Sequence, residues 1–153
     1  MIELDATDRR LLRALQRKGR LSNADLSEAV SLSPSACHRR VARLEREGII
    51  AGYVALLDRD AVGRQVTVFV EITLAGQTEK AFDAFELAVC QIPEVLECHM
   101  TAGSADYLLK VVVADSEDFA SLHRRHLAKL PGVAKMQSSF SLRRVRETTE
   151  LPV

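Results

Sequence analysis

The sequence predicts an α+β protein in which three short helices precede a four-stranded sheet with two helices. Over the first 48 residues, apolar side chains recur at helical spacing in three segments, and each segment begins with a residue suited to cap a helix. From residue 66 onwards, strand-like and helix-like runs follow one another in the order β-α-β-β-α-β. This order is the ferredoxin-like arrangement.

The first two helices are predicted from their N-terminal ends. Residues 5–18 place leucines at helical spacing, Asp5 suits the N-cap, and Asp8 takes the third helical position. Ser22 suits the cap of a second, shorter helix, with Asp25 three residues further on as in a capping box. We therefore expect both helices to begin on a side-chain hydrogen bond.

A tight turn at residues 31–32 leads into a third predicted helix. Ser33 caps this helix, and Pro34 takes its first position, where the missing N–H group costs nothing. Gly48 stops the helix. A short connection between two helices is what a helix-turn-helix requires. The segment 49–58 that follows is β-prone and is expected to form a wing or a linker strand.

The C-terminal half contains the elements of the ferredoxin-like unit. Pro93 and the pair Pro131–Gly132 each precede a strand and mark two similar halves. In chain order, strands and helices are expected at 66–74, 78–92, 95–103, 106–114, 116–130 and 133–145. The predicted domains are a winged helix-turn-helix at 1–58, a linker at 59–65, the ferredoxin-like domain at 66–145 and a tail at 146–153.

The third predicted helix has an apolar side and a basic side. On a helical wheel Cys37, Val41 and Leu44 fall together, so this side packs on the first two helices. The outward side presents Ser35, Arg39, Ala42, Arg43 and Arg46. Small residues let the helix backbone approach the floor of the DNA major groove, while Arg can bind a guanine edge or a phosphate. An ordinary solvated helix face is the competing interpretation, and the helix-turn-helix context favours DNA binding.

The roles along this helix are predicted from its direction. Residues at the N-terminal end of a recognition helix usually contact bases, and arginines further along contact phosphates. We expect Arg43 and Arg46 to bind phosphates. The predicted DNA-binding residues are Ser33, Ser35, Ala36, His38, Arg39, Arg40, Arg43 and Arg46.

The chain resembles the Lrp/AsnC family, the leucine-responsive or feast/famine regulators. The resemblance rests on a Leu-Asp start, Leu-x-x-Leu, Gly-Arg, Asp-Leu-Ser in place of the usual Glu-Leu-Ala, Leu-Ser, Arg-Val-x-Arg-Leu-Glu-x-x-Gly-Ile-Ile and Gly-Tyr. It extends through the ferredoxin-like half and covers nearly the whole chain. The combined pattern is highly specific, although each short piece alone is not.

The resemblance implies that residues 66–145 bind an amino acid between subunits and assemble the chain. Dimers would form by face-to-face pairing of sheets and then associate into tetramers or octamers. The effector would bind near the loop 101–107, where Gly103 allows close approach and Asp106 could receive an ammonium group. A plain hairpin turn would also contain such residues. The predicted effector-binding residues are His99, Met100, Gly103, Ser104, Ala105, Asp106, Tyr107, Gln137, Ser138 and Ser139.

Composition and motifs argue against several other classes of protein. The 153 residues carry no net charge, and no apolar run reaches the roughly 20 residues that a membrane span needs. The charged start of the chain is unlike a secretory signal. Three cysteines without C-x-x-C spacing are expected to be reduced thiols of a cytoplasmic protein.

Three alternative functions fit the sequence less well. A metal-responsive regulator is disfavoured, because the Cys37–His38 and Cys98–His99 pairs cannot easily chelate and His123 and His126 alone are too few. An enzyme is disfavoured because no nucleophile elbow, phosphate-binding loop or H-E-x-x-H motif is present. An amino-acid sensor without DNA binding would leave the arginine face unexplained.

We therefore predict a cytoplasmic, sequence-specific DNA-binding regulator of amino-acid metabolism or transport. Its expected partners are double-stranded DNA, a small amino acid and further copies of the chain, with no membrane and no other cofactor.

Overall fold

The computed structural model describes residues 3–153, so residues 1 and 2 of the predicted first domain lie outside it. The chain divides into two compact units. One holds the described residues up to Leu56 together with Arg146–Val153, and the other is Leu57–Val145. Among residues 3–153, no helix combines the length and apolar character that crossing a membrane requires.

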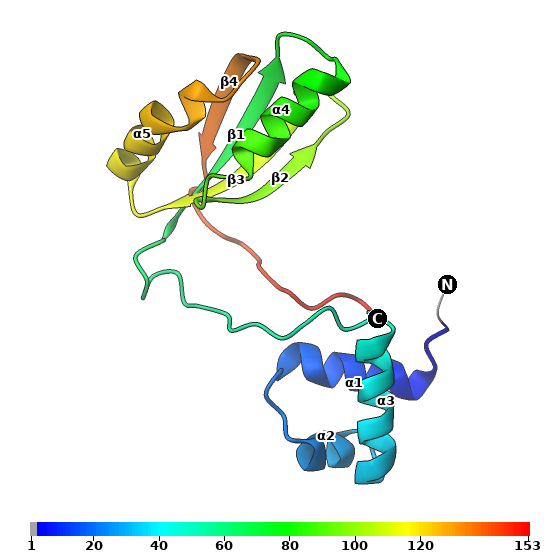
Figure 1. Cartoon of the computed structure of the whole chain (residues 1–153). Helices are drawn as coiled ribbons and strands as arrows, with labels where there is room; N and C mark the ends of the chain where they lie inside the picture. The colour runs from blue at the N-terminus through cyan, green and yellow to red at the C-terminus, as the bar shows by residue number, and fades with distance from the viewer. Residues whose placement is uncertain (1–2) are drawn as a thin grey trace. The chain divides into compact units, whose positions relative to one another are not determined.

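The first unit is built on three helices (Figure 1), which are α1 Ala6–Arg17, α2 Asn23–Ala29 and α3 Pro34–Arg46. Their shared core contains Leu11, Leu26, Val30 and Cys37, each at most 3% exposed. Burial raises the pKa of the Cys37 thiol, which therefore behaves as a small apolar side chain.

The predicted helix starts are confirmed. Asp5 and Asp8 form a reciprocal capping box at α1, with the Asp8 N–H donating to Asp5 Oδ1 at 2.7 Å. Ser22 caps α2, and Ser33 caps α3 with Pro34 in its first turn. The turn before α3 places Ser31 at φ 57°, a left-handed conformation that a short connection requires.

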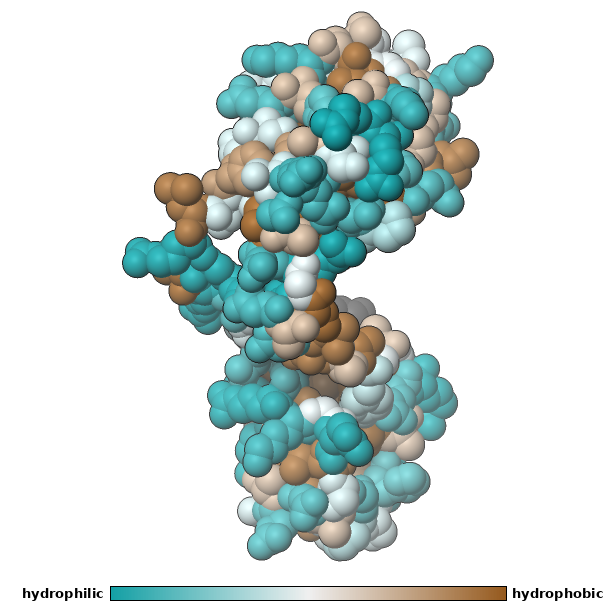
Figure 2. All heavy atoms as spheres, turned by 90° about the vertical axis from the view of Figure 1, so that its left-hand side faces the viewer, coloured by the Kyte–Doolittle hydropathy of each residue, from teal (hydrophilic) through white to brown (hydrophobic). Residues whose placement is uncertain are grey.

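The expected strand over residues 49–58 does not form. This segment has no regular secondary structure. A strand needs a partner for its backbone N–H and C=O groups, and none of the described residues pairs with it. Its side chains Tyr53, Val54, Leu56 and Leu57 are at least 50% exposed. Figure 2 shows hydrophobic side chains gathered at the upper end of the lower unit.

The second unit is a four-stranded antiparallel sheet in the order β2-β3-β1-β4. Helices α4 and α5 cover one face of the sheet (Figure 1), as the ferredoxin-like arrangement predicts. The predicted α+β fold class is confirmed. The elements of this unit are β1 Val66–Leu74, α4 Glu79–Val89, β2 Val95–Met100, β3 Tyr107–Val113, α5 Ser116–Arg125, a 3-10 turn Leu127–Lys129 and β4 Val133–Phe140.

Alternation along the central strand separates the two faces of this sheet. Val68, Val70 and Ile72 of β1 are fully buried beneath the helices, whereas Phe69 and Glu71 between them are exposed on the other face. The buried side joins Phe85 of α4 and other apolar residues in one core. The sheet therefore has one packed face and one open face.

Four elements end three or more residues earlier than predicted, and one of them is the helix expected at 78–92, which ends at Val89. The strand expected at 133–145 stops at Phe140, and one further hydrogen bond, from the Ser141 N–H to the Thr67 carbonyl, joins the chain to β1 beyond that point. The strand expected at 95–103 ends at Met100, where the loop begins. The helix expected at 116–130 ends at Arg125 and continues as the 3-10 turn.

Candidate DNA-binding surface and effector region

A buried carboxylate of α1 anchors the basic helix α3. Asp8 is 1% exposed. Its Oδ1 accepts from Arg40 at 2.8 Å, and its Oδ2 accepts from Arg43. Asp5 also accepts from Arg40, at 2.7 Å. Two helices that are far apart in sequence are thereby joined by three charge-assisted hydrogen bonds.

The Asp8 N–H group, and then the Arg40 guanidinium, lower the pKa of Asp5 to about 2. Because this folded-state pKa lies below the unfolded value, the associated stability is present above about pH 4 and is lost as the pH falls toward 2.

The placement of Arg43 corrects the wheel-based prediction. An outward-facing Arg43 was expected, but its side chain is only 34% exposed and bends back to Asp8. Its Nε atom is buried without a hydrogen bond among the described residues, and the nearest carboxylate oxygen, from Glu47, is 3.8 Å away. The long arginine stem makes this possible, because a wheel places the Cα atom and not the guanidinium. Arg40 and Arg43 thus hold α3 in place.

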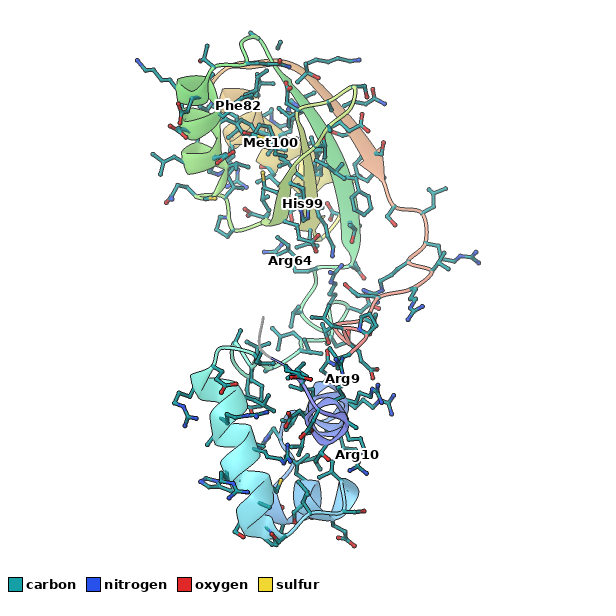
Figure 3. The ribbon with its side chains drawn as sticks, turned by 90° about the vertical axis from the view of Figure 1, so that its right-hand side faces the viewer. Arg9, Arg10, Arg64, Phe82, His99 and Met100 are labelled. Atoms are coloured by element: carbon teal, nitrogen blue, oxygen red, sulfur yellow. The ribbon has the colours of Figure 1, made fainter. Side chains whose placement is uncertain are left out.

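The outer surface of α3 retains a smaller set of polar side chains. Ser33, Ser35, His38, Arg39 and Arg46 are exposed, and Ala36 is half-buried. Within the described chain, no ion pair involves Arg39 or Arg46. These two guanidinium groups are therefore available to a ligand without breaking an internal contact. Arg9 and Arg10 are exposed on the neighbouring helix α1 (Figure 3).

Two further contacts fix the position of α3. Asn23 at the start of α2 donates its amide to the Pro34 carbonyl at 2.9 Å. The Tyr53 hydroxyl donates to Glu45 Oε1 at 2.9 Å, and burial together with Glu45 raises the pKa of Tyr53 to about 12. Both ends of α3 are thus attached to other parts of the first unit. A rigid helix with two unpaired arginines is suited to reading DNA.

The predicted effector loop is built around Asp106. Its Oδ2 accepts from the Leu74 N–H at 2.8 Å, and its Oδ1 accepts from the Gln77 amide at 2.9 Å. The loop is closed by a hydrogen bond from the Thr101 hydroxyl to the Ala105 carbonyl at 2.7 Å. Asp106 therefore organises the loop, and its carboxylate still has lone pairs for a further donor.

Tyr107 belongs to the core, not to a pocket lining. It is 1% exposed, its ring lies 4.5 Å from that of Phe85, and its hydroxyl donates to Glu86 at 2.7 Å. Burial is the main cause that raises its pKa. A free ligand cannot reach this side chain without unpacking the core.

The remaining predicted effector residues do not gather in one chain. Met100 lies toward Phe82 of α4, whereas His99 lies on the open face and contacts Glu97 at 3.2 Å (Figure 3). On β4, Gln137 and Ser139 pair with open-face positions of β1, and Ser138 pairs with a buried one. Gly103 and Ser104 are exposed and Ala105 is half-buried in the loop.

The strand order explains this dispersal. β2 and β4 are the two edges of the sheet. Three strand spacings of about 4.8 Å separate them, so Met100 and Ser138 are roughly 14 Å apart across the sheet. A site that used both sets of residues would need a second copy of the chain.

The comparisons with known proteins match both units. Residues 4–51 match the model of a winged helix-turn-helix DNA-binding domain, and residues 67–151 match that of the Lrp/AsnC ligand binding domain. The chain belongs to the Lrp/AsnC family of transcription regulators. The predicted family is therefore confirmed.

Three relatives cover almost the entire chain. The leucine-responsive regulatory protein of Escherichia coli K12 is 41% identical over 151 residues, which is 99% of this chain and 92% of the relative. A transcriptional regulator of Neisseria meningitidis in complex with L-methionine has a TM-score of 0.93 at 39% identity, covering 98% of this chain and 97% of that one. A feast or famine regulatory protein of M. tuberculosis, also complexed with L-methionine, has a TM-score of 0.86 at 31% identity, covering 97% and 99%.

Sequence reasoning missed two residues that position the sites. Asp8 was predicted only as a capping residue, although it lies on the same helical stripe as Leu11 and Leu12. An acidic residue on a buried stripe of the first helix, with arginines on the third helix, was the available signal. Gln77 gave no such signal, because its role depends on where the loop after β1 folds.

Possible metal ligands are dispersed. Within residues 3–153, no group of three or more His, Cys, Asp or Glu side chains is placed to hold a metal ion. His123 lies beside Phe119, with ring centroids 6.4 Å apart.

We predict that Asp8→Asn destabilises the first unit by about 3 kcal/mol, because it removes the buried charge that pairs with two arginines. Chemical denaturation followed by circular dichroism measures this. Glu28→Gln is the matched control, since it removes an exposed carboxylate of the same unit and is expected to change stability by less than about 0.5 kcal/mol. Equal stability of the two variants would contradict the anchoring role of Asp8.

Proposed function

We propose that this protein is a sequence-specific DNA-binding transcription regulator whose activity is set by an amino acid bound at a subunit interface. The observation that carries the proposal is the helix α3, fixed to α1 by Asp8 while its Arg39 and Arg46 remain unpaired on the outer surface. Membership of the Lrp/AsnC family supports the same function.

The proposed division of labour on α3 follows from exposure. Ser35, Ala36, His38 and Arg39 lie in the N-terminal half and are proposed to read base edges in the major groove. Arg46 in the last turn is proposed to contact a phosphate. Arg40 and Arg43 are used internally, so their contribution is to hold the helix at a fixed angle to the groove.

The effector is proposed to be an α-amino acid with an apolar side chain. Two relatives of known structure are complexes with L-methionine, and the E. coli relative is named for its response to leucine. In this chain Gly103 and Ser104 offer exposed backbone for the carboxylate, and Asp106 offers a fixed anion for the ammonium group. Which apolar side chain is accepted depends on residues that a second copy would supply.

Assembly into dimers or larger oligomers is part of the proposal. Two observations support it: the open face of the sheet carries exposed Phe69, and predicted effector residues lie on the two opposite edge strands. An amino acid bound between copies would favour one arrangement of the DNA-binding units over another.

We expect Arg39→Ala to weaken binding to the preferred DNA sequence by about 1–3 kcal/mol and to relax specificity, because a base contact is lost. Arg46→Ala should weaken binding to all sequences, because a phosphate contact is lost. The slope of the logarithm of the binding constant against the logarithm of salt concentration should become shallower by about 1. Fluorescence anisotropy on DNA selected from a random pool by the wild-type protein measures both. Arg124→Ala, an exposed arginine of α5, is the control and should bind as the wild type does.

We expect Asp106→Ala to abolish the response to an amino acid while sparing DNA binding. Asp106→Asn is the sharper variant, because its amide oxygen can still accept from the Leu74 N–H while the charge for the ammonium group is lost. Isothermal titration with L-methionine and L-leucine should show at least tenfold weaker binding in both variants. Gln77→Ala removes a loop contact but keeps the carboxylate, and should retain affinity. Normal binding by Asp106→Asn would place the ammonium contact elsewhere.

A further inference from the structure

The last residues of the chain are attached to the outer side of α1. Gln16 forms two hydrogen bonds with the backbone of Leu151, accepting from its N–H at 2.6 Å and donating to its carbonyl at 3.1 Å. Arg13 donates to the Val153 carbonyl at 2.7 Å, and Arg17 pairs with Glu150 at 3.0 Å. Three side chains on one side of α1 thus hold three residues of this segment.

An apolar hollow adjoins these polar contacts, and the Leu151 side chain beside it remains 69% exposed. Leu151 and Val153 line a hollow of about 400 Å3 together with Leu12 of α1 and Ile50. Leu12 is 7% exposed, so the segment lies next to the edge of the helical core. Paired backbone bonds and an adjoining apolar surface are typical of a docked segment, since a loose tail would satisfy its backbone with water.

This attachment gives the two units a second covalent connection. Residues 57–65 lead from the first unit into β1, and residues 141–145 lead from β4 back to the first unit (Figure 1). A five-residue connection reaches at most about 17 Å, compared with about 30 Å for a nine-residue one. While the segment is docked, the shorter connection limits how far the units can separate.

We propose that residues 146–153 act as an intramolecular strap that ties the effector unit to the DNA-binding unit through α1. The strap is joined by residues 141–145 to β4, the strand that carries Gln137 and Ser139, and it ends on the helix whose Asp8 holds α3. A displacement of β4 is thereby passed to the recognition helix, and release of the strap frees the DNA-binding unit. The regulatory meaning of the strap rests on the proposed function.

The docking of the strap is tested by hydrogen–deuterium exchange with mass spectrometry on the full chain. The Leu151 amide, resolved by overlapping peptides that cover residues 147–153, should exchange slowly in the wild type and at least about tenfold faster in Gln16→Ala, because its hydrogen bond to Gln16 Oε1 is lost. Gln91→Ala, an exposed glutamine of the other unit, is the matched control and should leave exchange unchanged. Full exchange of this segment within seconds in the wild type would overturn the proposal.

The restraint is tested by the motion of a dye on the first unit. A dye is attached to a cysteine introduced by Glu28→Cys, and the exposed Cys90 is removed by Cys90→Ser. The other two cysteines react slowly with the dye, because Cys37 is buried and burial raises the pKa of Cys98 to about 11. In time-resolved fluorescence anisotropy, the amplitude of nanosecond segmental motion should at least double in Gln16→Ala. A chain that ends at Arg146 should show the same increase.

Unchanged motion in both variants would overturn the strap, even if the segment is docked. A change in assembly mass on truncation, without increased dye motion in Gln16→Ala, would also overturn it and assign the segment to oligomer contacts. Neither experiment uses DNA or an amino acid, so their failure is distinct from a failure of the proposed function, which the DNA titrations test separately.

Discussion

The ion-pair network around Asp8 is the interaction on which the DNA-binding surface depends. A carboxylate that is 1% exposed is stable only because Arg40 and Arg43 neutralise it, and those contacts leave α3 little freedom to roll on α1. The network therefore divides the arginines of α3 into those that pair with Asp8 and those that stay exposed. Arg40 and Arg43 serve the fold, while Arg39 and Arg46 remain on the surface. DNA readout needs both kinds, because specificity requires contacts that arrive in a fixed geometry.

The sheet places a comparable constraint on effector binding. Its order puts β2, which carries His99 and Met100, and β4, which carries Gln137, Ser138 and Ser139, at opposite edges of the sheet. Asp106 is itself held by Leu74 and Gln77, which gives the loop a defined shape before any ligand arrives. The proposed binding between copies would make occupancy of the site sensitive to how the copies are arranged.

Much of the fold could be predicted from local sequence signals. The caps at Asp5, Ser22 and Ser33 each act within a few residues, and the alternation in β1 is a property of one strand. Tertiary contacts could not be predicted in the same way. Helical periodicity placed Arg43 on the outer side of α3, but its long side chain bends back and pairs with Asp8 of α1. Segment 49–58 had the composition of a strand, yet a strand forms only where a partner exists.

The most direct test of this account is the salt dependence of DNA binding by the wild-type protein. Fluorescence anisotropy on the DNA just upstream of its own gene, with random DNA as reference and with or without added amino acids, measures it. We expect selective binding, with a logarithm of the binding constant that falls linearly with the logarithm of salt concentration, since Arg39 and Arg46 displace counterions from the DNA. A shift of affinity on adding an apolar amino acid is also expected. Binding no tighter than to random DNA, for both this fragment and fragments selected from a random pool, would contradict the account.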